Sequence, residues 1–236
     1  MGLRTKTGED WMLLLKLGQR EHLEMLRKGL LYMNSLAFFN SLEADQARGD
    51  RREGTDYAYQ PGDCEFVLDP GIPGSEKIRV SEASGLAGVR IWTQRTSSCN
   101  IFCMFAVTNP IEGSLFPKSH PWFEFGDSFL IFTQTQEFLS RVEAAAKHQG
   151  LKGECRLVQY YDEDKYSGEI GRFRKSSIFS YQREYRIALE TGIGGPFRFE
   201  IGDLSDITSD ILALDAADHV LKLRPEGFEA AGLIWD

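Results

Sequence analysis

The stretch at 179–189, which reads Phe-Ser-Tyr-Gln-Arg-Glu-Tyr-Arg-Ile-Ala-Leu, has the two-residue period of a β-strand. Because successive side chains of a strand point to opposite faces, the stretch predicts a strand with one largely apolar face. The apolar face would carry Tyr181, Arg183, Tyr185, Ile187 and Leu189, and the polar face Ser180, Gln182, Glu184 and Arg186. An amide, a carboxylate and a guanidinium in one row could hold a substrate, and they could equally form the solvated face of an ordinary sheet.

Hydrophobic periodicity elsewhere predicts a strand-rich α+β fold with few helices and mostly antiparallel, possibly split, sheets. The opening reads as strand, helix, strand over 11–17, 20–28 and 30–39, and a second helix is expected from 135 to 149. Further strands are expected at 89–94, 100–108 and 123–133, which would pair with one another, and at 155–161, 181–190, 197–201 and 220–223. The turn-forming residues at 192–196 indicate a hairpin between two of these strands.

Composition predicts one soluble domain over residues 1–236. The chain has 236 residues and is 42% hydrophobic and 26% charged, and its N-terminal sequence fits neither a signal peptide nor a membrane-spanning helix. A net charge of -8 argues against a nucleic-acid footprint over the whole chain. The four cysteines lack C-x-x-C spacing and the four histidines lack ligand spacing, so reduced thiols, a cytoplasmic location and no metal are expected.

The segment at 41–61 is rich in charge and poor in apolar residues, which predicts a mobile surface loop or a short helix followed by a loop. It contains Arg48, Arg51 and Arg52. Guanidinium groups bind phosphate bidentately, so the loop could hold a pyrophosphate or a nucleic-acid backbone. A merely solvated loop is the alternative.

Two further groups of residues suggest a binding site. Tyr32 lies close in sequence to Asn34 and Ser35, a combination suited to stacking and orienting a flat heterocycle. Glu184 could form hydrogen bonds or stabilise charge in a transition state, and a salt bridge to Arg186 is the structural alternative. The preceding segment, which contains Lys175, favours the functional interpretation.

These motifs carry two resemblances. One is to an uncharacterised family of bacterial and phage proteins, and it implies no activity. It rests on the strand Gly29-Leu30-Leu31-Tyr32-Met33-Asn34-Ser35, the loop Arg48-Gly49-Asp50 followed by Glu53-Gly54, and a late pattern of Lys175, Phe179, Gln182, Glu184, Tyr185 and Arg186.

The other resemblance is to the ADP-ribosyltransferase superfamily, in which a strand–helix–strand opening precedes a β-rich body and a late strand carries Gln-x-Glu or Glu-x-Glu. Gln182 and Glu184 match that pair. The resemblance implies NAD as a substrate, with Glu184 bonding the nicotinamide ribose and favouring its oxocarbenium-like state, and with Gln182 orienting the acceptor. It also implies a stacking role for Tyr32.

The resemblance is looser at two other positions. Asn34-Ser35 stands where the superfamily has Ser-Thr-Ser, and Lys16 lies in a first strand that usually contains His or Arg. The expected cofactor-binding residues are Lys16, Tyr32, Asn34, Ser35 and Arg48.

The sequence therefore favours an NAD-dependent ADP-ribosyltransferase-like toxin or phage-defence effector that modifies a protein or nucleic acid, with an antitoxin or immunity protein as a further partner and no membrane contact. A non-enzymatic bacterial or phage module that binds a partner through its sheet face and arginine-rich loop is the alternative. A nuclease is disfavoured, because Asp, Glu and His are not clustered with metal-binding spacing.

Overall fold

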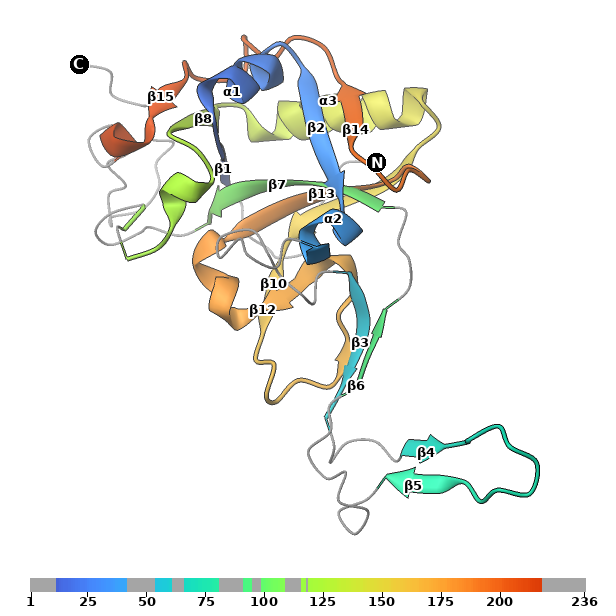
Figure 1. The fold of residues 1–236 in the computed structure, drawn as a ribbon. Helices are drawn as coiled ribbons and strands as arrows, with labels where there is room; N and C mark the ends of the chain where they lie inside the picture. Colours follow the sequence, from blue (N-terminus) through green and yellow to red (C-terminus); the bar gives the residue numbers. More distant parts are fainter. Residues whose placement is uncertain are drawn as a thin grey trace.

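The computed structural model describes residues 12–41, 54–60, 66–80, 91–94, 99–108, 116–117 and 119–217. These residues form a strand-rich α+β fold around an eight-stranded sheet in which every pairing is antiparallel (Figure 1). The strands of this sheet are β1 (Leu13–Gly18), β2 (Leu30–Ser35), β7 (Cys99–Val107), β8 (Ser128–Phe132), β9 (Lys152–Leu157), β13 (Glu184–Glu190), β14 (Phe197–Glu200) and β15 (Leu212–Ala213). The α-helices of the described part are α1 (Arg20–Arg27), α2 (Leu36–Ser41) and α3 (Thr135–His148).

The sheet is organised on β7. One edge of β7 pairs with β13 over residues 99–105. The other edge is shared, because β2 pairs with it at 100–101 and β1 pairs with it at 105–107. β1 and β2 run in the same direction and diverge between these contacts, where β1 continues along β8 and β2 along β14. The sheet is therefore split on one side of β7.

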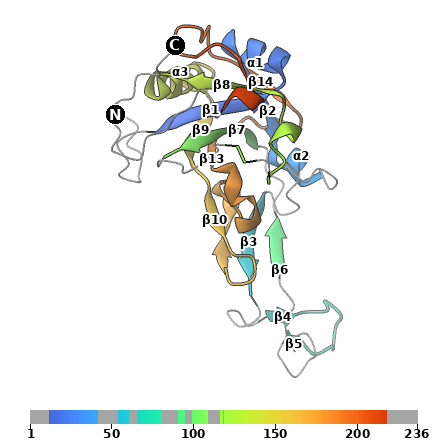
Figure 2. The ribbon, with the colours of Figure 1, turned by 90° about the vertical axis from the view of Figure 1, so that its left-hand side faces the viewer.

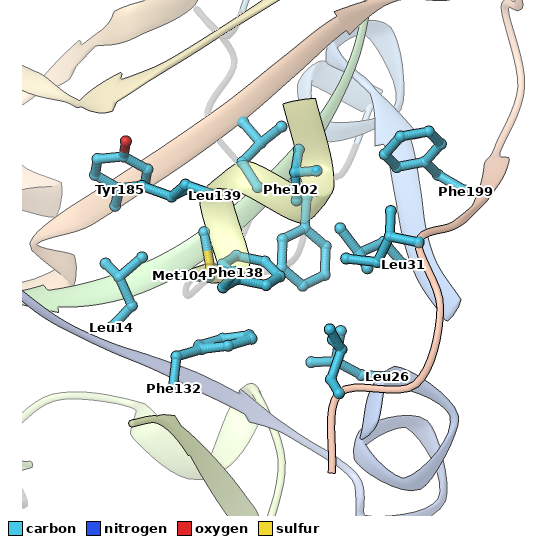
Figure 3. Packing of buried hydrophobic residues seen from close by; sticks show 14 of the residues in the cluster. Leu14, Leu26, Leu31, Phe102, Met104, Phe132, Phe138, Leu139, Tyr185 and Phe199 are labelled. Atoms are coloured by element: carbon cyan, nitrogen blue, oxygen red, sulfur yellow. The ribbon is translucent and has the colours of Figure 1, made fainter. Parts of the chain in front are cut away.

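One face of the sheet is covered by α1 and α3 and buries the largest hydrophobic cluster. Figure 3 shows Phe102 and Tyr185 of the sheet among this cluster, with Leu26 from α1 and Phe138 from α3. α1 contributes to it because its two buried leucines are three residues apart and so lie on one side of the helix. Tyr185 faces this core, so its neighbours on β13 face the opposite side of the sheet.

The opposite face is covered by short elements. The 3₁₀ helices η2 (Trp122–Glu124) and η4 (Ser177–Gln182) add aromatic rings to a cluster around Phe105. The 3₁₀ helix η3 (Gly171–Phe173) and α2 pack over Ile101 in a second cluster. A further 3₁₀ helix, η5 (Leu214–Ala216), follows β15.

Smaller sheets extend from the body. β3 (Thr55–Tyr59) pairs with β6 (Ile91–Gln94) and β11 (Gly168–Glu169), and β4 (Phe66–Leu68) pairs with β5 (Ile78–Val80). Figures 1 and 2 show β3, β6 and the β4–β5 hairpin projecting away from the central sheet. β10 (Gln159–Tyr161) pairs in parallel with β12 (Arg174–Ser176) beside η4.

The strand–helix–strand opening and the antiparallel α+β class are confirmed, and several details differ. The expected strand at 30–39 divides into β2 and α2. The three middle strands do not pair with one another, because β1 lies between β7 and β8 while β6 pairs with β3. Residues 192–196 do not close a hairpin, since β14 pairs with β2 and β13 pairs with β7 and β9. The expected strand at 220–223 lies outside the described residues.

Within the described part of the chain, no helix has the length and apolar character needed to span a bilayer.

Candidate functional site

The strand expected at 179–189 begins only at Glu184. Residues Ser177–Gln182 form η4, and β13 follows from Glu184 to Glu190. The helical turn brings Tyr181 against the ring of Trp122, at 5.2 Å between ring centroids, and stacks it on His120 at 4.3 Å. Packing of aromatic rings into the cluster around Phe105 thus overrides the alternation of the sequence, and the prediction is wrong for the first half of this stretch.

Arg183 joins η4 to β13 in a left-handed backbone conformation, with φ of 41°. Its N–H donates to the carbonyl of Ser180 at 3.2 Å, and its own carbonyl accepts from the N–H of Ala106 at 2.8 Å. This change of direction turns the side chains of Gln182 and Glu184 toward the same lysine, although the two residues lie on different elements.

That lysine is Lys175 of β12. Its Nζ donates to Oε1 of Gln182 at 2.8 Å and to Oε1 of Glu184 at 2.9 Å. The guanidinium of Arg186 donates to Oε2 of Glu184 at 2.7 Å. All four side chains are buried, so both oxygens of the Glu184 carboxylate are bonded to buried cations. We call Lys175, Gln182, Glu184 and Arg186 the glutamate network.

The glutamate network keeps Glu184 ionised. Burial of the carboxylate acts to raise its pKa, but the charges of Lys175 and Arg186 and their hydrogen bonds outweigh burial and hold the pKa far below its usual range. Such a group is a weak proton acceptor. It accepts hydrogen bonds, and it stabilises positive charge nearby only to the extent that Lys175 and Arg186 leave its own charge unbalanced.

Tyr160 connects the glutamate network to the surface. The backbone N–H of Glu184 donates to the Tyr160 hydroxyl at 2.9 Å, and burial raises the pKa of that phenol, which therefore stays neutral. Tyr160 also lines an open surface depression. The other residues that line it are Gln159, Tyr161, Asp162, Lys165, Tyr166 and Arg174.

Two of the predicted binding residues share the sheet face of Glu184. Asn34 lies directly opposite Ile101, and Glu184 directly opposite Phe105, so all four side chains point to one face. Tyr32 is on the same side of β2 as Asn34 and is 50% exposed. It is separated from β13 by β7.

Ser35 and Lys16 are placed elsewhere. Ser35 lies on the opposite side of β2, is buried, and its Oγ accepts from the N–H of Phe38 at the start of α2. Lys16 points to the face covered by α1 and α3. Its Nζ donates to the carbonyl of Cys103 at 2.6 Å and lies 4.7 Å from the centre of the Phe102 ring. Lys16 thus lies where β1 and β2 diverge along β7.

Arg48 lies outside the described residues, as do Arg51 and Arg52. Thr55–Tyr59, near the C-terminal end of the segment expected to be a loop at 41–61, forms the strand β3. The structure therefore brings Gln182 and Glu184 together and places Tyr32 and Asn34 on the same face. It does not bring Lys16 or Ser35 to them.

Comparison of the chain with family models, curated proteins and solved structures finds no match. The site is thus interpreted from its own geometry. Among the described residues, no group of three or more His, Cys, Asp or Glu side chains is arranged to hold a metal ion.

Sequence reasoning missed two members of this arrangement. Lys175 appears in the late sequence pattern but is not predicted as a site residue, and its flanking residues, Arg174 and Ser176, give no signal that it is buried. Tyr160 had no such signal, because its contact with Glu184 depends on how β10 packs.

Proposed function

We propose that this protein is an NAD-dependent ADP-ribosyltransferase whose catalytic centre is the glutamate network. The observation that carries the proposal is the convergence of Gln182 and Glu184 on Lys175, with Glu184 held as a buried anion. A fixed anion next to an amide suits a reaction that generates positive charge on a sugar and then directs an acceptor to it.

The arrangement of strands supports an ADP-ribosyltransferase-like fold for the chain. β1, α1 and β2 follow the strand–helix–strand order with which that superfamily begins, and the rest of the body is built mainly of antiparallel strands. The split between β1 and β2 along β7 places Tyr32 and Glu184 on two sides of one strand, with their side chains on the same sheet face. β2 and β13 pair with opposite edges of β7, so they lie two strand spacings, about 10 Å, apart where all three strands pair.

In the proposed reaction, the bond between C1′ of the ribose and the nicotinamide nitrogen breaks. Its electron pair leaves with nicotinamide, which becomes neutral, and C1′ becomes electron-deficient. An oxygen or nitrogen of the acceptor donates a lone pair to C1′ and releases a proton to solvent, which completes the transfer.

The residues have distinct roles in this scheme. Glu184 accepts a hydrogen bond from a ribose hydroxyl in exchange for one of its contacts with Lys175 or Arg186, and its charge stabilises the oxocarbenium-like state. Gln182 orients the acceptor, and Tyr32 stacks on nicotinamide. Asn34 is the polar neighbour that would orient the ring.

Modification of a protein or nucleic acid by this reaction blocks the modified site. We therefore propose a toxin or phage-defence effector, whose producer would carry an antitoxin or immunity protein.

Incubation of the purified protein with labelled NAD and cell lysate tests the proposal. The wild type is expected to transfer label to an acceptor, and Glu184→Gln to lose transfer. Glu190→Gln, at the far end of the same strand in a half-exposed pair with Arg172, is the matched control and should retain it. Absence of transfer by the wild type, or equal transfer by a folded Glu184→Gln variant, would overturn the proposal.

A binding module without enzymatic activity is the second candidate, and one observation favours it. Both carboxylate oxygens of Glu184 are already bonded, and only 9% of its side chain is exposed. In that case the glutamate network is purely structural, and partner binding depends on the arginine-rich loop. Charge reversal at Arg48, Arg51 and Arg52 would then abolish partner binding, whereas Glu184→Gln would leave the affinity of the folded protein unchanged.

A further inference from the structure

Arg183 combines an unfavourable backbone conformation with a central position. It is the one non-glycine residue with positive φ among the described residues, at φ 41° and ψ 50°. In this conformation the Cβ of an L-residue crowds the following carbonyl oxygen, so glycine or asparagine would be accommodated more easily. The residue lies between Gln182 and Glu184, both of which depend on its turn.

The side chain of Arg183 has no compensating contact within the described part of the chain. It is exposed, and it makes no hydrogen bond, ion pair or ring contact with another described residue. The neighbouring arginines differ, because Arg172 pairs with Glu190 and Arg186 with Glu184. Strained residues that persist at such positions are commonly functional.

We propose that Arg183, which lies beside the glutamate network, binds a phosphate group of the substrate through its guanidinium. This inference rests on the proposed function, because a dinucleotide substrate carries a diphosphate and a nucleic-acid acceptor carries phosphodiesters. Both present the oxygen pair that a guanidinium binds bidentately. The backbone bonds of Arg183 to Ser180 and Ala106 fix the base of the side chain, so it projects from one defined point beside Glu184.

Arg183→Gly separates this role from a structural one, since it removes the guanidinium and relieves the backbone strain. The variant is expected to unfold about 2–4 °C higher than the wild type and to bind ADP-ribose at least about tenfold more weakly by calorimetry. Arg183→Lys keeps the charge and the strain, so its unfolding temperature should match the wild type and its affinity should be intermediate. Lys28→Ala, which removes an exposed charge at the C-cap of α1, is the control and should bind like the wild type.

The probes identify the source of the phosphate. If the dinucleotide supplies it, affinity for ADP-ribose depends on Arg183 and affinity for adenosine does not. If the acceptor supplies it, affinity for a short single-stranded oligonucleotide depends on Arg183, and affinity for ADP-ribose does not. The inference is overturned if Arg183→Gly binds both ADP-ribose and the oligonucleotide as tightly as the wild type does. It is also overturned if the wild type binds neither of these two probes.

The same measurements separate this inference from the proposed function. Arg183-dependent binding without NAD turnover would leave the phosphate site standing and remove the enzyme. NAD turnover together with binding that does not depend on Arg183 would support the enzyme and remove the phosphate site.

Discussion

At the scale of single residues, Glu184 is a buried carboxylate whose charge is balanced by two buried cations. Lys175 and Arg186 offset the cost of burying its charge, and Gln182 shares the same lysine. Buried ion pairs contribute little compared with a hydrophobic replacement, but removing one partner leaves the others uncompensated. The glutamate network therefore makes a strong prediction about stability that does not depend on catalysis.

Glu184→Gln is expected to lower the free energy of unfolding by about 3–5 kcal/mol at pH 7, because two buried cations lose their carboxylate. Denaturant unfolding of the purified variant measures this loss. Glu190→Gln removes a half-exposed partner of Arg172 and should cost no more than about 1 kcal/mol. Equal effects of the two substitutions would contradict the assignment of Glu184 to a buried network.

The pH dependence of stability provides a second test at this scale. The pKa of Glu184 is lower in the folded than in the unfolded chain, so its contribution is fully present above the unfolded value, about 4.3, and is lost as pH falls through the folded value. Thermal unfolding between pH 7 and pH 3 should therefore show the gap between wild type and Glu184→Gln narrowing below about pH 4. A gap that stays constant would show that the carboxylate is not preferentially ionised in the fold.

At the scale of elements, the junction between α1 and β2 depends on Gly29. It has φ of 96°, and a Cβ built there would lie 1.9 Å from the carbonyl oxygen of Gly202. Its own carbonyl accepts from the N–H of Ile201, so the two loops cannot separate without breaking that bond.

Gly29→Ala is expected to destabilise the fold by about 2–5 kcal/mol, because steric overlap adds to backbone strain. Gly202→Ala is the matched control. Gly202 also has positive φ, at 84°, but its Cβ would meet nothing within 4 Å, so only the strain of about 1–2 kcal/mol applies. Similar unfolding midpoints for the two variants would contradict this packing of the junction between α1 and β2 against residues 201–202.

Hydrophobic periodicity predicts some of these elements and not others. The β1–α1–β2 opening was readable, because each element has a clear period and Gly29 marks the end of the helix. The first half of 179–189 was not, because a 3₁₀ turn held by Tyr181, Trp122 and His120 reflects tertiary contacts that alternation does not encode. The convergence of Gln182 and Glu184 depends on the conformation of Arg183, which no residue type at that position suggested.

At the scale of the whole molecule, the class of fold followed from composition and pattern, whereas the order of strands did not. The insertion of β1 between β7 and β8 joins segments about 90 residues apart, and nothing local specifies that pairing. The same pairing decides which candidate residues meet. It places Lys16 on one face of the sheet and Glu184 on the other, a distinction invisible in the sequence.

In the proposed reaction, the bond between ribose and nicotinamide in NAD breaks at the glutamate network. Release of nicotinamide by the purified protein, followed by chromatography at pH 7.5, tests it without knowledge of the acceptor. We expect the wild type and Glu190→Gln to release nicotinamide, and Glu184→Gln to release it at a rate at least about 100-fold lower under conditions where circular dichroism shows the variant folded. Release by folded Glu184→Gln at the wild-type rate, or no release by the wild type with or without cell lysate, would contradict it.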